Sequence, residues 1–261
     1  MESGFNVEHL HVRVYPSARE MGAAAAFDVA RQLRELLRVQ RSVRAVFAAA
    51  VSQETFLDAL VREVGIDWRR VEVLQLDEYV GLRSDDPTTL RRWLEVHLGA
   101  RVPIGRAEYM EGAAEDLADE CARYEAVIQR EPIDLGVLGI GENGHLAFND
   151  PHVADFADRR SVKVVDIDET SRLQQVHDGA FPSTIAVPQR ALTVTIPAIL
   201  AMRAVTVVVP GRAKAHAVSA ALVDPVSHAC PASVLRHHNA AVLYLDADSY
   251  ADARSRGAPN G

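Results

Sequence analysis

The sequence predicts an α/β fold, a single-domain and doubly wound, mostly parallel sheet of the Rossmann-like type with helices on both faces. Short apolar runs alternate with longer amphipathic segments along the chain, which is typical of strands joined by helices. The run VTVVV at 205–209 is apolar or β-branched at every position, as strands buried on both faces are. A chain of 261 residues can enclose one large core. We therefore expect one domain over residues 1–261.

The spacing of apolar residues predicts each element. Apolar and β-branched runs predict strands at 9–14, 43–48, 71–76, 134–138, 161–165, 191–196, 205–209 and 240–245. A 3.6-residue period predicts helices over 17–39, 53–64, 88–97, 115–129, 169–176 and 212–222. Ser17 and Ser52 stand where helix N-caps are expected. The segment from about 249 to 261 follows neither pattern, so we expect a loose C-terminal tail there.

Composition and charge argue against several classes of protein. The net charge is −8, with 28 basic and 36 acidic residues, so a nucleic-acid partner is not expected. No apolar stretch reaches the roughly 18 residues of a membrane span, and the start MESGFNVEHLHVRVY lacks a secretory pattern. Two cysteines are too few for a disulfide framework or a metal cage. These features predict a cytoplasmic protein with no membrane partner.

Ligands of open α/β sheets bind where strands end and the chain turns into the next segment. One such turn, GIGENGHLAFNDP at 139–151, places Gly139, Gly141 and Gly144 in a GxGxxG spacing. That spacing makes an NAD-dependent oxidoreductase one alternative. However, the dinucleotide motif should open a helix in the first βα unit. This copy lies in the middle of the chain and is followed by the helix-breaking Pro151.

The same turn presents His145 close in sequence to Glu142, Asn143 and Asp150. Histidine is the side chain best matched to proton transfer near neutral pH. The structural alternative is a histidine packed under the loop and bonded to a backbone carbonyl. The glycines, the two acids and the position at a strand end favour a catalytic role.

A second turn, LDEYVGL at 76–82, places Asp77 and Glu78 directly after a predicted strand. A carboxylate pair at this position suits a ligand-binding loop. The alternative is an acidic turn exposed to solvent.

Together, LDEYVGL and GIGENGHLAFNDP resemble motifs of the glucosamine-6-phosphate deaminase (isomerase) family, within the fold group that also contains 6-phosphogluconolactonases. The resemblance continues through VPQRALTVTIPAIL and VVVPGRAKAHAV, so it covers nearly the whole chain. Lactonases carry a DER-type segment in place of DEYVG. Their glycine-loop histidine is also not followed by AFN, an acid and a proline.

The resemblance implies an enzyme that converts an aminohexose 6-phosphate to a ketose phosphate and ammonia, without a metal or cofactor. By match to the motifs, His145 moves a proton to the ring oxygen and opens the sugar. Asp77 matches the general base that takes the C2 proton and returns it at C1. An aspartate near its reference pKa of ~3.9 is ionised at pH 7 and available as that base.

This sequence departs from the family pattern beside the histidine. The best-studied members carry an aspartate at the position of Asn143 and a glutamate at that of Asp150. Asn143 can orient the ring but cannot balance imidazolium charge, whereas Asp150 keeps the charge on a side chain one methylene shorter. We therefore expect His145 and Asp150 to form the charged pair, with Asn143 as the orienting group.

The phosphate end also differs, because AAAVSQETF replaces a glycine- and threonine-rich turn. Ser52 still stands at a predicted helix N-terminus, which favours an anion. Arg172 lies about one helical turn from the position of a phosphate-binding arginine in the family, and Gln175 is nearer to it. Lys214 matches a family lysine, and it is one of only two lysines among the 28 basic residues. The expected substrate-binding residues are Ser52, Gln53, Glu78, Gly141, Gly144, Arg172 and Lys214.

Three alternatives to the deaminase remain. Lactone hydrolysis or another phosphosugar isomerisation would use the same scaffold. A sugar-phosphate sensor would use it without catalysis, although this chain has no spare residues for a DNA-binding module. The NAD-dependent oxidoreductase is the third. A small-molecule phosphosugar is the expected partner, and a homo-oligomer is compatible with the sequence.

Overall fold

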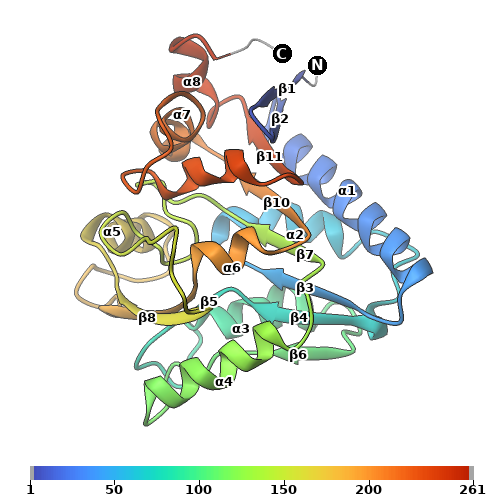
Figure 1. Cartoon of the computed structure of the whole chain (residues 1–261), viewed down its shortest axis with the longest axis vertical. Helices are drawn as coiled ribbons and strands as arrows, with labels where there is room; N and C mark the ends of the chain where they lie inside the picture. Colours follow the sequence, from blue (N-terminus) through green and yellow to red (C-terminus); the bar gives the residue numbers. More distant parts are fainter. Residues whose placement is uncertain (1–2, 259–261) are drawn as a thin grey trace.

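The computed structural model describes residues 3–258. Its main sheet has eight strands in the order β1-β2-β11-β10-β7-β3-β4-β6, which Figure 1 shows from top to bottom of the molecule. All neighbouring pairs are parallel except β1 and β2. The strands are β1 Ser3–Val7, β2 Leu10–Tyr15, β3 Val43–Phe47, β4 Val71–Gln75, β6 Arg106–Glu108, β7 Leu135–Leu138, β10 Ala204–Val209 and β11 Ala241–Asp246.

Helices cover both faces of this sheet, because successive strand residues point to opposite faces. In β10, Val207 belongs to one hydrophobic core and Val208 to the other. Helices α1, α2 and α3 contribute to the second of these cores, and α4, α6, α7 and α8 to the first. The helices are α1 Ala18–Val39, α2 Glu54–Leu60, α3 Leu90–Leu94, α4 Leu117–Gln129, α5 Glu169–His177, α6 Ile196–Leu200, α7 Ala215–Val223 and α8 Ala251–Ser255. The predicted mostly parallel α/β sheet is confirmed.

The strand order reverses between β3 and β7. The chain runs outward from β3 through β4 to β6, and then returns to β7 on the other side of β3. From β7 it continues through β10 and β11 toward the opposite edge. In open α/β sheets such a reversal leaves a crevice at the carboxyl ends of the two strands, and ligands bind there.

The strands expected at 161–165 and 191–196 form, but they lie outside the main sheet. They are β8 Val162–Asp166 and β9 Arg190–Val194, and with β5 Asp77–Tyr79 they build an antiparallel sheet in the order β5-β9-β8. Because β9 is buried on both sides, its pattern is the same as that of a strand in the main sheet. The strands with which β9 pairs, and not its own residue pattern, show to which sheet it belongs.

The expectation of a loose tail from about 249 is wrong for residues 249–258. Tyr250 is buried and packs against Phe5 of β1 at a ring-centroid distance of 5.7 Å, and Ala253 of α8 is fully buried. Residues 259–261 of the expected tail lie outside the described residues. The segment is too short for a periodic signal, so long-range packing determines its structure.

Two helix starts can be compared with the expected N-caps. Ser17 caps α1, because its hydroxyl accepts a hydrogen bond from the Glu20 N–H. Ser52 does not cap α2, since it lies inside the 3-10 turn Val51–Gln53 that precedes the helix. The helix expected over 88–97 divides into α3 and a π-helix at Glu95–Gly99. Within residues 3–258, no helix has the length and apolarity to cross a membrane.

Candidate active site

Three of the predicted turns meet at the carboxyl edge of the main sheet. The segments after β3, β4 and β7 line one cavity, and α5 covers its side. This cavity lies at the reversal between β3 and β7, where ligand binding is expected. Its polar lining consists of Ser52, Asp77, Tyr79, His145, Gln174 and Gln175.

Asp77 is the first residue of β5 and pairs in register with Thr193 of β9. Its side chain lines the cavity but is only 8% exposed. Burial, together with the carboxylate of Glu78, raises the pKa of Asp77 to about 8. The expectation of an aspartate near its reference pKa is therefore wrong for the unliganded protein. At pH 7 the protonated form predominates, and the ionised form is a correspondingly stronger base.

Glu78 points away from the cavity, although the sequence predicted it as a substrate-binding residue. Its carboxylate accepts hydrogen bonds from the backbone N–H groups of Leu90 and Arg91 at 3.0 and 2.8 Å, at the start of α3. The amide of Gln75 donates a further bond at 2.8 Å. Glu78 therefore anchors α3 to the loop that carries Asp77.

His145 lies in the glycine turn after β7, with its ring directly against the backbone of Gly141. The Gly141 N–H also donates to the His145 carbonyl at 3.0 Å, which closes the turn. Gly144 adopts a left-handed φ of +85°, and a Cβ there would lie 2.7 Å from the sulfur of Cys230. Neither glycine opens a helix, so the turn does not have the form of a dinucleotide-binding motif.

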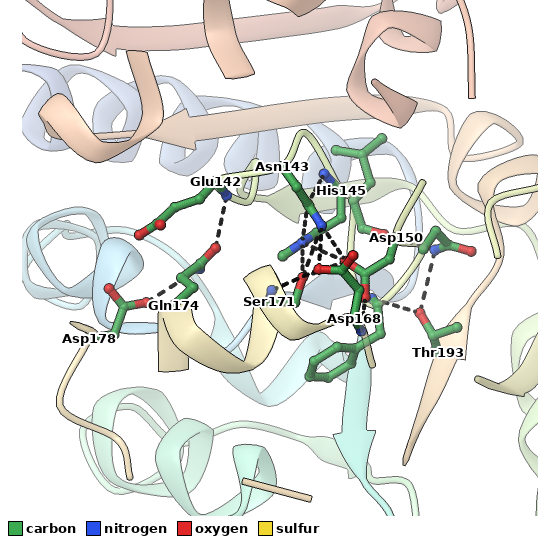
Figure 2. Close-up of polar contacts among 12 residues, drawn as sticks. Glu142, Asn143, His145, Asp150, Asp168, Ser171, Gln174, Asp178 and Thr193 are labelled. Atoms are coloured by element: carbon green, nitrogen blue, oxygen red, sulfur yellow. Dashed lines mark hydrogen bonds and ion pairs between the residues drawn. The ribbon is translucent and has the colours of Figure 1, made fainter. Parts of the chain in front are cut away.

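The Nδ1 nitrogen of His145 faces a cluster of oxygen atoms, which Figure 2 shows converging from the turn and from α5. Nδ1 lies 2.8 Å from Oδ1 of Asn143, 2.8 Å from Oγ of Ser171 and 3.0 Å from Oδ1 of Asp150. The amide nitrogen of Asn143 donates to Asp150 at 2.9 Å. The expected groups around the histidine therefore come together, joined by a serine from α5.

Asp150 is the buried anion of this cluster, with no exposed surface. Burial alone would raise its pKa, but His145, Asn143 and Ser171 stabilise the carboxylate and lower the pKa of Asp150 to about 2. Its second oxygen accepts a hydrogen bond from the Asp168 N–H at 3.0 Å. The shorter aspartate thus reaches the ring and stays ionised at neutral pH.

The turn is held in a strained shape beyond the histidine. Ala147 lines the cavity with a left-handed φ of 52°, which is unusual for a residue other than glycine. Asn149 is fully buried, and its amide donates to the carbonyls of Leu146 and Val194, each at 2.8 Å. These bonds fasten the turn to β9, the strand that also pairs with Asp77.

Lys214 ends the 3-10 turn that follows β10 and is 4% exposed. Its ammonium has no hydrogen-bond partner among residues 3–258. Burial lowers the pKa of Lys214, while the carboxylates of Asp178 and Glu142 act in the opposite direction. A buried ammonium without a close partner is costly for the folded protein, so this position suits an anion.

The other residues expected to bind substrate have different surroundings. Ser52 lines the cavity. Gln53 lies behind it, and its amide donates to Ser52 and to the carbonyl of Val208. Arg172 points toward the loop after α5 and donates to the Thr184 carbonyl at 3.5 Å. Gln175, rather than Arg172, faces the cavity and accepts a hydrogen bond from the Tyr79 hydroxyl at 2.7 Å.

Residues 16–244 match the family model of glucosamine-6-phosphate isomerases/6-phosphogluconolactonase. The chain belongs to this family. Two relatives named glucosamine-6-phosphate deaminase, from Bacillus thuringiensis (strain Al Hakam) and Bacillus cereus (strain AH820), are each 34% identical over 191 residues. The match covers 73% of this chain and 71% of each relative.

Solved structures extend the comparison beyond the aligned sequence. A monomeric glucosamine-6-phosphate deaminase superposes with a TM-score of 0.85 at 29% identity, over 92% of this chain and 99% of that one. A 6-phosphogluconolactonase from Thermotoga maritima superposes with a TM-score of 0.73 at 18% identity, over 90% and 98% of the two chains. The second likeness shows the shared fold of the glucosamine-6-phosphate isomerase/6-phosphogluconolactonase family.

Sequence reasoning missed two polar residues of α5 that contact the glycine turn of the candidate site. Ser171 contacts the His145 ring, and the side-chain oxygen of Gln174 accepts a bond from the Glu142 N–H at 2.9 Å. The local sequence of α5 carries no signal for either contact, because both partners lie in a distant turn. In the described part of the chain, no group of three or more histidine, cysteine or acidic residues is arranged to hold a metal ion.

Proposed function

We propose that this chain converts glucosamine 6-phosphate to fructose 6-phosphate and ammonia. The observation that carries the proposal is the presence of Asp77 and His145 in one cavity, with an ionised Asp150 beside the histidine. The family membership supports it, as do the relatives named glucosamine-6-phosphate deaminase.

The first step of the proposed reaction opens the sugar ring. The Nε2 nitrogen of His145 takes the proton of the C1 hydroxyl, C1=O forms and the C1–O5 bond breaks. The imidazolium then gives its proton to O5. Asp150, 3.0 Å from the opposite ring nitrogen, stabilises the imidazolium while it exists.

Asp77 performs the isomerisation in the second step. In its ionised form it removes the proton from C2, and the resulting enolamine receives this proton at C1. The product is an iminium at C2. Water adds there and ammonia leaves, which yields the ketose. A carboxylate whose pKa is raised by burial is a stronger base toward carbon than an exposed one.

The phosphate group is proposed to bind Ser52, which lies in the cavity wall, and Lys214, which lies in the turn after β10. The support is the buried ammonium of Lys214, which has no hydrogen-bond partner in the described residues, and the hydroxyl of Ser52 in the cavity wall. Arg172 is directed elsewhere, so a single lysine supplies the positive charge. A cytoplasmic location and a role in amino sugar catabolism complete the proposal.

The direct test is to incubate the purified chain with glucosamine 6-phosphate in the absence of nucleotide and to measure ammonia and fructose 6-phosphate. We expect the two products in equal amounts. Galactosamine 6-phosphate in a parallel reaction examines the stereochemistry at C4. Hydrolysis of 6-phosphogluconolactone without ammonia release from the amino sugar would contradict the proposal and favour the lactonase alternative.

A further inference from the structure

We propose that Ser171 is a positioning residue that keeps the hydrogen of the neutral His145 ring on Nδ1, so that Nε2 is the nitrogen that exchanges protons with the substrate. The expected effects on kcat rest on the proposed function, whereas the expected tautomer of the ring does not. Ser171 is fully buried and does not line the cavity. It therefore acts through the histidine and not by contact with substrate.

The orientation of the Asn143 amide is determined by its neighbours. Its oxygen accepts a hydrogen bond from the His145 backbone N–H at 3.1 Å, and a backbone N–H is only ever a donor. Its nitrogen lies 2.9 Å from an oxygen of Asp150, and an ionised carboxylate only accepts. The amide oxygen therefore faces Nδ1 of His145, at 2.8 Å.

Ser171 presents a lone pair to the same nitrogen. Its hydroxyl hydrogen is used by Asp150, because Oγ donates to Oδ1 of that carboxylate. Oγ also accepts a hydrogen bond from the Asn143 amide nitrogen at 3.3 Å, and its other lone pair faces Nδ1 at 2.8 Å. Nδ1 is thus surrounded by three oxygen atoms that accept, from Asn143, Ser171 and Asp150, and it must carry the hydrogen.

The opposite nitrogen is then the basic one. Nε2 makes no hydrogen bond within residues 3–258, and His145 lines the cavity. In the neutral ring Nε2 has a free lone pair, which is what acceptance of the C1 hydroxyl proton requires. After proton transfer the imidazolium keeps its Nδ1–H directed at the oxygens, so the ring need not turn between the two halves of ring opening.

Ser171 is well placed to hold this arrangement because it comes from a rigid element. The first turn of α5 is fastened by Asp168, whose carboxylate accepts from the Ser171 N–H at 3.1 Å, and whose own N–H donates to Asp150. Removal of the Ser171 hydroxyl leaves these bonds in place. Figure 2 shows Ser171 at the start of α5, close to both Asp150 and the histidine ring, with Asp168 beside them.

The test uses Ser171→Ala, which removes only the oxygen, and Ser171→Thr, which retains a hydroxyl. A hydrogen bond to a charged group is worth roughly 1.5–3 kcal/mol, so Ser171→Ala should lower kcat by about 10- to 150-fold. KM should stay unchanged, because Ser171 does not touch the cavity. Ser171→Thr should recover most of the activity. Exchange of the C2 proton in open-chain substrate should change little in either variant.

The ¹⁵N chemical shifts of the His145 ring provide a readout that does not depend on activity. In the native chain Nδ1 should have the shift of a protonated nitrogen and Nε2 that of an unprotonated one. In Ser171→Ala the two shifts should move toward each other as the second tautomer becomes populated. Ser219→Ala is the matched control, since Ser219 is a buried helical serine outside the cavity.

Two results would overturn the inference. The first is an unprotonated Nδ1 in the native chain. The second is an unaltered tautomer together with an unaltered kcat in Ser171→Ala. If Ser171→Thr does not fold, the alanine variant and its ring shifts decide alone. If the native chain releases no ammonia from glucosamine 6-phosphate, the proposed function fails, and the ring shifts still test the role of Ser171.

Discussion

The imidazole of His145 occupies the space that a side chain at Gly141 would need. A Cβ built on Gly141 would lie 2.1 Å from Cε1 and 2.2 Å from Nε2 of that ring, well inside van der Waals contact. The sequence predicted Gly141 as a substrate-binding residue. Gly141 does line the cavity, and the absence of a side chain there also allows the His145 ring to pack against the backbone at the cavity wall.

Replacement of Gly141 with alanine should therefore displace the ring from its position. We expect kcat to fall by at least about tenfold, since small misplacements of catalytic groups are costly. The fold should survive, because only the ring has to move. Gly99→Ala is the control, as a Cβ there meets no atom closer than 3.9 Å. Native kcat in Gly141→Ala would show that the ring position is not critical.

Asp77→Asn should lower kcat by roughly 10²–10⁴, the usual contribution of a positioned acid–base group. The amide has nearly the same shape as the carboxylate but cannot remove a proton from C2. Steady-state ammonia release measures the effect, and loss of C2 proton exchange assigns it to the isomerisation step. Asp85→Asn is the control, because Asp85 is an exposed aspartate in the loop that follows. Turnover close to native in Asp77→Asn would remove Asp77 from the mechanism.

The pKa of about 8 for Asp77 predicts the pH dependence of both activity and stability. The ratio kcat/KM reports groups of the free enzyme, so it should rise about tenfold per pH unit below pH 8 and level off above it. The folded protein keeps the Asp77 proton up to about pH 8, whereas the unfolded chain loses it near pH 4. The Asp77 contribution to stability therefore decreases as pH rises between these values.

Asp77→Asn removes this ionisation. The free energy of unfolding of the variant, minus that of the native chain, should therefore increase from pH 4 to pH 8 and then stay constant. Urea unfolding at several pH values measures the difference. A constant difference over this range, or a kcat/KM profile that is flat between pH 6 and 8, would contradict the raised pKa.

Lys214→Met should reduce kcat/KM for the phosphorylated sugar by about 10- to 150-fold, equivalent to the loss of a charge-assisted hydrogen bond. The unphosphorylated sugar should be affected little. The same variant should be more stable than the native chain without substrate, because a buried and unpartnered ammonium is replaced by an apolar side chain. Lys163→Met is the control, since Lys163 is paired with Asp158. Equal losses for both sugars would place Lys214 away from the phosphate.

The local sequence was sufficient to predict much of this protein. Apolar spacing predicted the longer helices and six of the eight strands of the central sheet, because period and burial are recorded in consecutive residues. The two edge strands β1 and β6 were not predicted. The position of turns at strand ends, together with the motifs, identified Asp77, His145 and Lys214 as candidates. The pairing of His145 with Asp150 was predicted as well, and Nδ1 of His145 lies 3.0 Å from Oδ1 of Asp150.

Long-range contacts determined the rest. The antiparallel pairing of β5 with β9, the folding of α8 and the contact of Ser171 with His145 join segments whose own sequences do not specify their partners. The same reason applies to Asp77, whose pKa was expected near 3.9 but is raised to about 8. Desolvation depends on everything packed around a carboxyl group. The sequence by itself determined which residues are candidates for the chemistry, and only the tertiary structure decided which neighbours surround each of them and how far those neighbours shift its pKa.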